Sequence, residues 1–189
     1  MPRYLATLFC LLGILIQGCA TNYEAPQGEP IAKLRIISNV SNNNYITVGD
    51  NPTCIAAGSP EFEPKIAVLG ALANSMINNG AGVSVGVPLP TGRLSKQTTE
   101  VLVPAGKPFV LHGAAMSLWR IQWPGTIIYN YCKAGVIFTP DENSAYEAVF
   151  NKEPSDNCTF SIYQFEQVGE SAWIRVPLVS AKSITKLCR

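Results

Sequence analysis

The sequence is short of charge and of the side chains that most often carry catalysis or metal binding. Charged residues make up 14% of the 189 positions, against a typical ~25%. His112 is the only histidine, no run of like charge exceeds two residues, and no CxxC pair occurs. Structural zinc sites use such closely spaced ligands, and nucleic-acid binding needs a surplus of cations. We therefore expect no metal, no cofactor and no nucleic-acid partner.

One motif typical of catalytic serines is present, but the sequence around it does not predict the turn and the base that the motif requires. Residues 82–86 read GVSVG and match G-x-S-x-G around Ser84. That motif works on a strand-to-helix turn with a histidine base nearby, whereas Pro88 and Pro90 follow here in place of a helix. We interpret the stretch as a glycine-rich turn and predict that the chain is not an enzyme.

The longest apolar run at the amino terminus is too short to span a membrane. It covers Leu5 to Ile16, about a dozen residues after the basic Arg3, and a spanning helix needs ~20. These features are typical of a secretory signal. The junction Ile16-Gln17-Gly18-Cys19 resembles the lipobox of bacterial lipoproteins, although Gln17 departs from the small or β-branched residue usual there.

The lipobox resemblance implies that Cys19 receives a diacylglyceryl group and that residues 1–18 are removed as a signal peptide. Ala20 follows the cysteine, and in lipoproteins of enterobacterial type the absence of aspartate there implies transport to the outer membrane. Residues 19–31 contain two prolines and a glycine and predict a tether. Fully extended, its twelve residues after Cys19 reach only ~40 Å, so we expect the domain to lie close to the periplasmic face of the outer membrane, with the bilayer as one partner.

The mature chain has the composition of a turn-rich β protein. Nine short β-like runs alternate with turn residues and cover residues 33–37, 45–48, 98–103, 108–112, 126–131, 133–139, 145–150, 158–165 and 172–176. Strands at this spacing without intervening helical segments indicate an antiparallel sandwich or barrel. We predict one all-β domain over residues 32–189, an antiparallel β-sandwich of immunoglobulin-like or transthyretin-like type.

The region 60–95 departs from this β pattern. Ile66 to Ile77 is small and apolar and predicts a helical or semi-helical insertion, and Val83 to Leu89 reads as an edge strand or an extended loop. Such a long connection either packs over one end of the sandwich or forms a surface that touches a partner. Residues 179–187 predict a short terminal helix.

Four cysteines remain once Cys10 leaves with the signal and Cys19 is assigned to lipid. An even number in an exported chain predicts two disulfides, and four cysteines permit three pairings. We predict Cys54–Cys132 and Cys158–Cys188, the second fastening the carboxy-terminal segment to the sheet.

Two tryptophans are the strongest candidates for a ligand site. Trp119 and Trp123 lie four residues apart, followed by Pro124-Gly125. Exposed, they would form a platform for a small ligand or a glycan; buried, they would pack in the core. The sequence leaves both interpretations open.

The body of the chain resembles small, uncharacterised lipoproteins of the Gram-negative outer membrane. The resembling features are Ala32 to Arg35, Val103 to Pro108, Phe138-Thr139-Pro140, Tyr146-Glu147 and the cysteines 132, 158 and 188. The resemblance implies a β-rich, disulfide-linked periplasmic domain without an activity to transfer. We therefore expect a non-enzymatic protein-interaction or accessory module with an envelope protein as partner; the alternative is a ligand-binding or glycan-binding module.

Overall fold

The described part of the chain consists of strands and their connections. The computed structural model describes residues 23, 27–40, 44–49, 52–55, 65–69, 84–88, 98–122, 124–153 and 157–188. No helix occurs within these ranges. The predicted signal peptide, Cys19 and Trp123 lie outside them.

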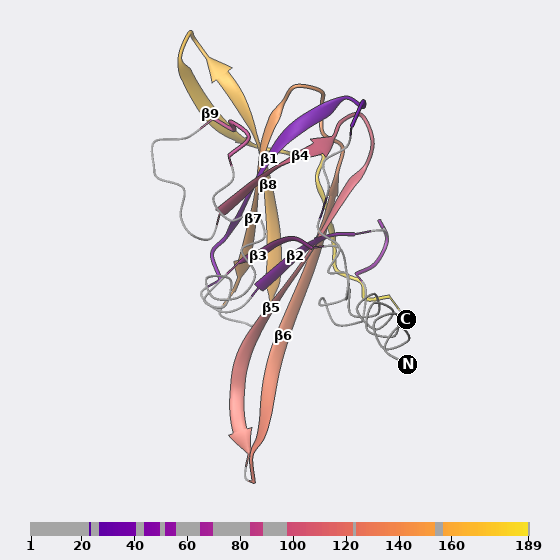
Figure 1. Ribbon diagram of the computed structural model, residues 1–189, viewed down its shortest axis with the longest axis vertical. Helices are drawn as coiled ribbons and strands as arrows, with labels where there is room; N and C mark the ends of the chain where they lie inside the picture. The colour runs from indigo at the N-terminus through magenta and orange to yellow at the C-terminus, as the bar shows by residue number, and fades with distance from the viewer. Residues whose placement is uncertain are drawn as a thin grey trace, which may run out of the picture.

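Ten strands form two five-stranded sheets (Figure 1). The first sheet has the order β4(Thr98–Pro104), β1(Ile31–Ser38), β7(Ala145–Lys152), β8(Cys158–Val168) and β9(Ala172–Pro177). The second has the order β10(Lys182–Ile184), β6(Thr126–Phe138), β5(Phe109–Gln122), β2(Asn44–Val48) and β3(Lys65–Leu69). All neighbours are antiparallel except β1 and β7, which are parallel. The predicted all-β sandwich is confirmed.

The core lies between the sheets and follows from the alternation of side chains along each strand. In β1, Ala32, Leu34 and Ile36 are each at most 1% exposed, because every second side chain of a strand points to the same face. Large side chains from both sheets complete this cluster and include Val103, Leu111, Val136, Phe138, Tyr146 and Phe150. The chain crosses from one sheet to the other between β1 and β2, between β4 and β5, and between β6 and β7.

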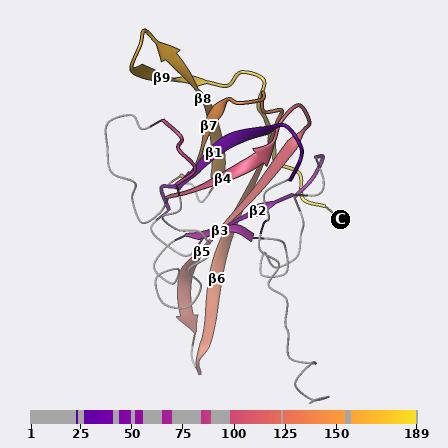
Figure 2. The same cartoon turned by 45° about the horizontal axis from the view of Figure 1, so that its top comes forward.

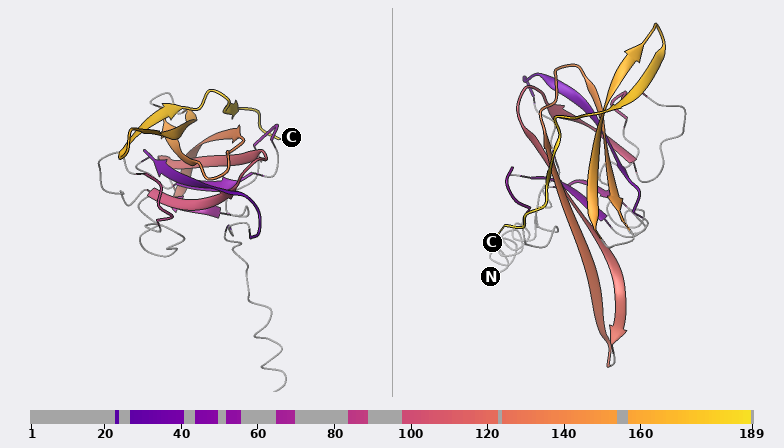
Figure 3. Two further views of the ribbon diagram at one scale, coloured as in Figure 1. Left: turned by 90° about the horizontal axis from the view of Figure 1, so that it is seen from above. Right: turned by 180° about the vertical axis from the view of Figure 1, so that it is seen from behind.

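Two hairpins project from opposite ends of the sandwich. The β8–β9 hairpin extends at one end and the β5–β6 ribbon at the other (Figures 1 and 2; Figure 3, right). β2 pairs with β5 only as far as Ala115, whereas β5 and β6 remain paired to Gln122 and Thr126. Within the described residues, the outer part of the ribbon is therefore two-stranded.

Two segments predicted to be helical are strands instead. Residues 66–69 of the expected insertion 66–77 belong to β3 on the edge beside β2, and residues 70–77 lie outside the described ranges. Lys182–Ile184 forms β10 against β6. Both strands are short edge strands, and pairing to an existing sheet decides their structure where a short apolar run is ambiguous between helix and strand.

Part of the predicted tether is packed against the domain. The hydroxyl of Tyr23 donates to Leu102 O at 2.9 Å, and its ring meets Phe109 edge-on. Burial raises the pKa of Tyr23 to about 12. Glu29 and Lys107 form an exposed ion pair at 2.6 Å. The link from Tyr23 back to Cys19 thus spans four residues, or ~14 Å when extended.

The disulfide pairing predicted from the sequence is wrong. The structure joins Cys54 to Cys188 and Cys132 to Cys158, with Cα–Cα distances of 5.1 and 5.4 Å. Ile55 pairs with Leu187 and holds the segments of Cys54 and Cys188 side by side. Cys132 on β6 and Cys158 at the start of β8 lie in different sheets and link them. This proximity depends on strand order, which cysteine spacing does not reveal.

Removing the Cys54–Cys188 bond is expected to cost more stability than removing Cys132–Cys158. The sequence separations are 134 and 26 residues, and loop-closure entropy then gives about 5 and about 3.5 kcal/mol. Urea unfolding of the two Cys→Ser double variants measures the difference. Equal losses, or a larger loss for the shorter loop, would contradict this order; non-reducing peptide mapping checks the pairing itself.

Candidate protein-interaction site

A buried row of charged side chains crosses the outer face of the first sheet. Arg35 on β1 is in register with Glu100 on β4 and with Glu147 on β7. All three point away from the core, yet each is at most 2% exposed. A buried charge is tolerated only where it is paired and hydrogen-bonded, so something must cover and satisfy these groups.

Arg35 joins the two carboxylates. Its Nε and one terminal nitrogen donate to Glu100 Oε1 at 3.0 and 2.9 Å, and its other terminal nitrogen lies 3.5 Å from Glu147 Oε2. Arg175 on β9 donates to Glu147 Oε1 at 2.6 Å. We call Glu100, Arg35, Glu147 and Arg175 the ionic ladder. Arginine suits its centre because the planar guanidinium offers five donors in a fixed arrangement.

The extended segment 84–88 covers the ladder, and we call it the strap. Glu100 Oε2 accepts hydrogen bonds from the Ser84 hydroxyl and from the amides of Val85 and Val87. Arg35 in turn donates to Val87 O at 2.8 Å. Burial alone would raise the pKa of Glu100, but the hydrogen bonds from Ser84, Arg35 and the two amides outweigh burial and lower it.

The strap also brings its own apolar contacts to this face. Val87 is 4% exposed and forms a small cluster with Ala145 and Phe165, against which Val85 packs. The Arg35 guanidinium lies 5.5 Å from the centre of the Phe165 ring. The first sheet is therefore covered on both faces near its centre, by the main core on one side and by the strap on the other.

The outer end of the ladder positions the β8–β9 hairpin. Arg175 lies 4.2 Å from the centre of the Tyr163 ring and is bound to the buried Glu147, while its own side chain is 43% exposed. Beyond this point the hairpin leaves the body (Figure 3). It exposes large apolar side chains, with Val168 at 50%, Trp173 at 42% and Ile174 at 46%. Trp173 and Ile174 are adjacent on β9 and so point to opposite faces.

No family model, curated protein or solved structure matches this chain. Within the described ranges, no helix is long and apolar enough to cross a membrane. In the same ranges, no group of three or more His, Cys, Asp or Glu residues is arranged to hold a metal ion.

The residues singled out in the sequence do not meet in one site. Ser84 is held by Glu100 over the first sheet, whereas His112 is buried on β5 of the second sheet, where its ring lies against Gly49 and Gly135. The structure therefore does not bring these two side chains together. Trp119 lies on β5 at a register shift between Leu118 and Arg120, and Trp123 lies outside the described residues.

Sequence reasoning missed the ionic ladder. A signal for it exists, because Glu100 and Glu147 each stand alone among apolar or β-branched residues in TTEVLV and AYEAVF, and Arg35 lies between Leu34 and Ile36 in KLRII. A single charge in the middle of such a run faces the solvent side of a strand or requires a buried partner. Only the sheet order, with β1 between β4 and β7, shows that the three side chains share one row.

Glu100→Gln is expected to lower the free energy of unfolding at pH 7 by about 3 kcal/mol, since it leaves buried Arg35 without one of its carboxylates. The lowered pKa of Glu100 also adds stability that is present above the unfolded pKa of ~4.3 and is lost as the pH falls through the lower folded value. The variant should therefore lose less stability than the wild type on acidification below pH 4. Urea unfolding from pH 7 to pH 3, with exposed Glu142→Gln as control, measures both effects; parallel pH profiles would contradict the assignment.

Proposed function

We propose that the chain is a lipid-anchored, non-enzymatic protein-interaction module on the periplasmic side of the Gram-negative outer membrane. The observation that carries the interaction role is the β8–β9 hairpin, which exposes Val168, Trp173 and Ile174 beyond the body of the domain. Large aromatic and aliphatic side chains that are exposed on a projecting hairpin favour a binding surface. Tryptophan is among the residues that contribute most to protein–protein affinity.

The architecture of the hairpin supports a protein partner. β9 is an edge strand, paired only with β8 among the described residues. An edge strand offers main-chain donors and acceptors to another strand, and neighbouring side chains add selectivity. Arg175, bound to the buried Glu147, fixes the root of the hairpin, so the exposed side chains are held in place before binding and less freedom is lost on association.

The proposed anchor supports the location. Tyr23 packs against Leu102 and Phe109 of the domain. A lipid on Cys19 would therefore hold this part of the domain within ~14 Å of the lipid-bearing residue. One acyl chain binds a bilayer only marginally, whereas the several chains of a mature lipoprotein hold it stably. A partner in the same envelope layer would then meet the domain at high local concentration.

A photo-crosslinking amino acid in place of Trp173 is expected to yield one discrete adduct in intact cells of the native host. The same amino acid in place of Val179, which is 95% exposed but outside the hairpin, should yield none. Ile174→Asp should reduce the adduct at least tenfold, whereas Val179→Asp should leave it unchanged. Equal adducts from both positions, or none from position 173, would overturn the proposal for this hairpin.

Cys19→Ser is expected to abolish incorporation of labelled palmitate and to move the protein from the membrane to the soluble fraction. The substitution spares Cys54, Cys132, Cys158 and Cys188, which form the two disulfides, so the thermal unfolding of the domain should not change. Membrane fractionation and a melting curve of the released protein measure the two effects. Retention of the variant on membranes would contradict the anchor.

A further inference from the structure

The outer edge of β6 is only partly covered. Among the described residues, β10 alone pairs with this edge, and only from Gly135 to Ile137. After β10 the chain turns away, because Ile55 N donates to Lys186 O and Cys188 N donates to Ile55 O. Cys54–Cys188 fixes that turn covalently. Figure 3 (right) shows the yellow carboxy-terminal segment passing β6 and then leaving it.

The polar backbone groups of this edge can be assigned residue by residue. Gly49 N donates to Val110 O at 3.0 Å, so Val110 faces β2, and Leu111, the next residue, faces β6 opposite Val136. The register between β5 and β6 is continuous from Val136 to Tyr131. Since the N–H and C=O groups of successive residues point to alternate sides, those of Tyr131 point away from β5, toward the open side.

The residues of this edge lack the features that usually prevent an edge strand from pairing with another chain. Residues 126–131 read TIIYNY, with no charge and no proline, and isoleucine, tyrosine and threonine favour strands. Natural sheets protect exposed edges with charges, proline or bulges. The β5 edge of the same ribbon has such features, since it carries Arg120 and a register shift between Leu118 and Arg120. The β6 edge is therefore the one suited to accept another strand.

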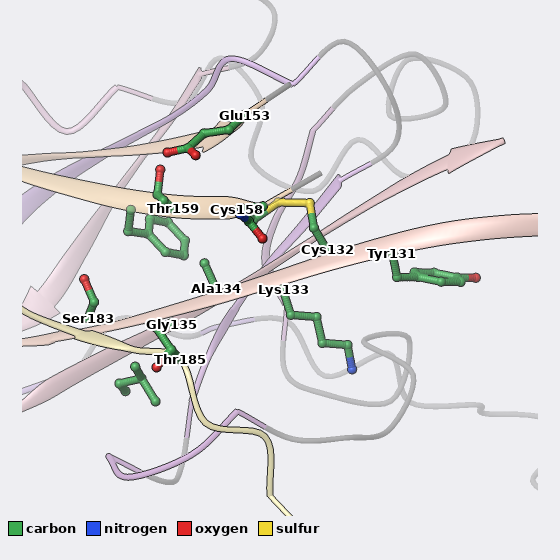
Figure 4. A pocket seen from close by; sticks show the side chains of 13 residues that line it. Tyr131, Cys132, Lys133, Ala134, Gly135, Glu153, Cys158, Thr159, Ser183 and Thr185 are labelled. Atoms are coloured by element: carbon green, nitrogen blue, oxygen red, sulfur yellow. A yellow bond between two sulfur atoms is a disulfide. The ribbon is translucent and has the colours of Figure 1, made fainter. Parts of the chain in front are cut away.

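A cavity of about 510 Å³ lies at the inner end of this edge. It is lined by β6 from Tyr131 to Gly135, by the start of β8 and by residues 183–185 after and within β10. Figure 4 shows Cys132 and Cys158 joined across it, with Thr159 on one side and Ser183 and Thr185 on the other. These hydroxyl groups can donate to and accept from a polypeptide backbone, and the volume falls within the ~300–1,000 Å³ typical of ligand sites.

We propose that the β6 edge from Thr126 to Tyr131, together with this cavity, binds an extended strand of a partner polypeptide, which continues the second sheet where β10 ends. The site is separate from the β8–β9 hairpin and does not depend on it. A second copy of the chain fits less well. Twofold pairing of two β6 edges would bring the Pro124-Gly125 turn to the cavity. Glu153 and the hydroxyls of Thr159 and Ser183 line this cavity and favour a polar occupant.

Selection from a phage-displayed library of random twelve-residue peptides on the immobilised mature domain tests this site. Tyr131→Pro removes the outward N–H without removing a β5–β6 hydrogen bond, as proline is tolerated at an edge facing solvent. Tyr131→Thr is the matched control, because it removes the ring but keeps the N–H. Selected peptides should bind the Pro variant at least tenfold more weakly than the Thr variant.

Amide hydrogen exchange of the wild-type domain gives an independent readout if the Pro variant fails to fold. Peptide binding should protect the amide of Tyr131, which points outward, and leave the protection of Asn130, which points to β5, unchanged. Failure to enrich peptides, equal binding by the Pro and Thr variants, or loss of binding in Ile174→Asp would overturn the proposal. A wild-type dimer that Tyr131→Pro dissociates in sedimentation would overturn it in favour of a second copy.

Discussion

The guanidinium of Arg35 is the group on which the arrangement of the first sheet depends. It sits on the outer face between two carboxylates that are as buried as itself, and removing three charges from water is costly. The strap makes this possible, because Ser84 and the amides of Val85 and Val87 satisfy Glu100 while Val87 O accepts from Arg35. The dependence is mutual. Without the strap the ladder would be a set of solvent-exposed pairs worth less than ~1 kcal/mol each, and without the ladder the strap would lose most of the hydrogen bonds that hold it.

The two sheets are stabilised by different means. Charge pairs and the strap cover the outer face of the first sheet, whereas Cys132–Cys158 links the two sheets and Cys54–Cys188 joins two segments outside the strands. On the outer face of the second sheet, Ile55 and Ile184 pack with Val110 in a small separate cluster, and Cys54–Cys188 holds these segments together. That cross-link also sets the path of the carboxy-terminal chain, so β10 remains three residues long and β6 extends past it. The same bond that stabilises this face therefore leaves part of the β6 edge without a partner strand in the described part of the chain.

The sequence predicted the sandwich well because alternation and turn residues are local signals. The run 33–37 became the centre of β1, and 98–103, 145–150 and 172–176 each fell within one observed strand. Errors arose where the deciding interaction is distant. β5 continues ten residues beyond its predicted end as the partner of β6. The small Gly113 within it leaves room for the Phe150 ring, which packs where a Cβ would lie. The parallel β1–β7 pair, the disulfide partners and the ionic ladder all require sheet order, which no single segment encodes. Cys19 remains a prediction of the lipobox alone.

The projecting hairpins differ in how firmly they are held, and that difference bears on how each would bind. Along the ladder the side-chain exposure rises from 1% at Glu147 to 43% at Arg175. The buried Glu147 carboxylate on β7 therefore holds a partly exposed side chain on β9. The β8–β9 hairpin is thus fixed at its root by an ion pair, a ring contact and six residue pairs with β8. The outer β5–β6 ribbon has only its own two strands among the described residues, and a two-stranded hairpin is marginally stable in water. A third strand along β6 would supply the missing main-chain hydrogen bonds, so binding there would stabilise the ribbon itself, whereas binding at β9 would use a surface already in place.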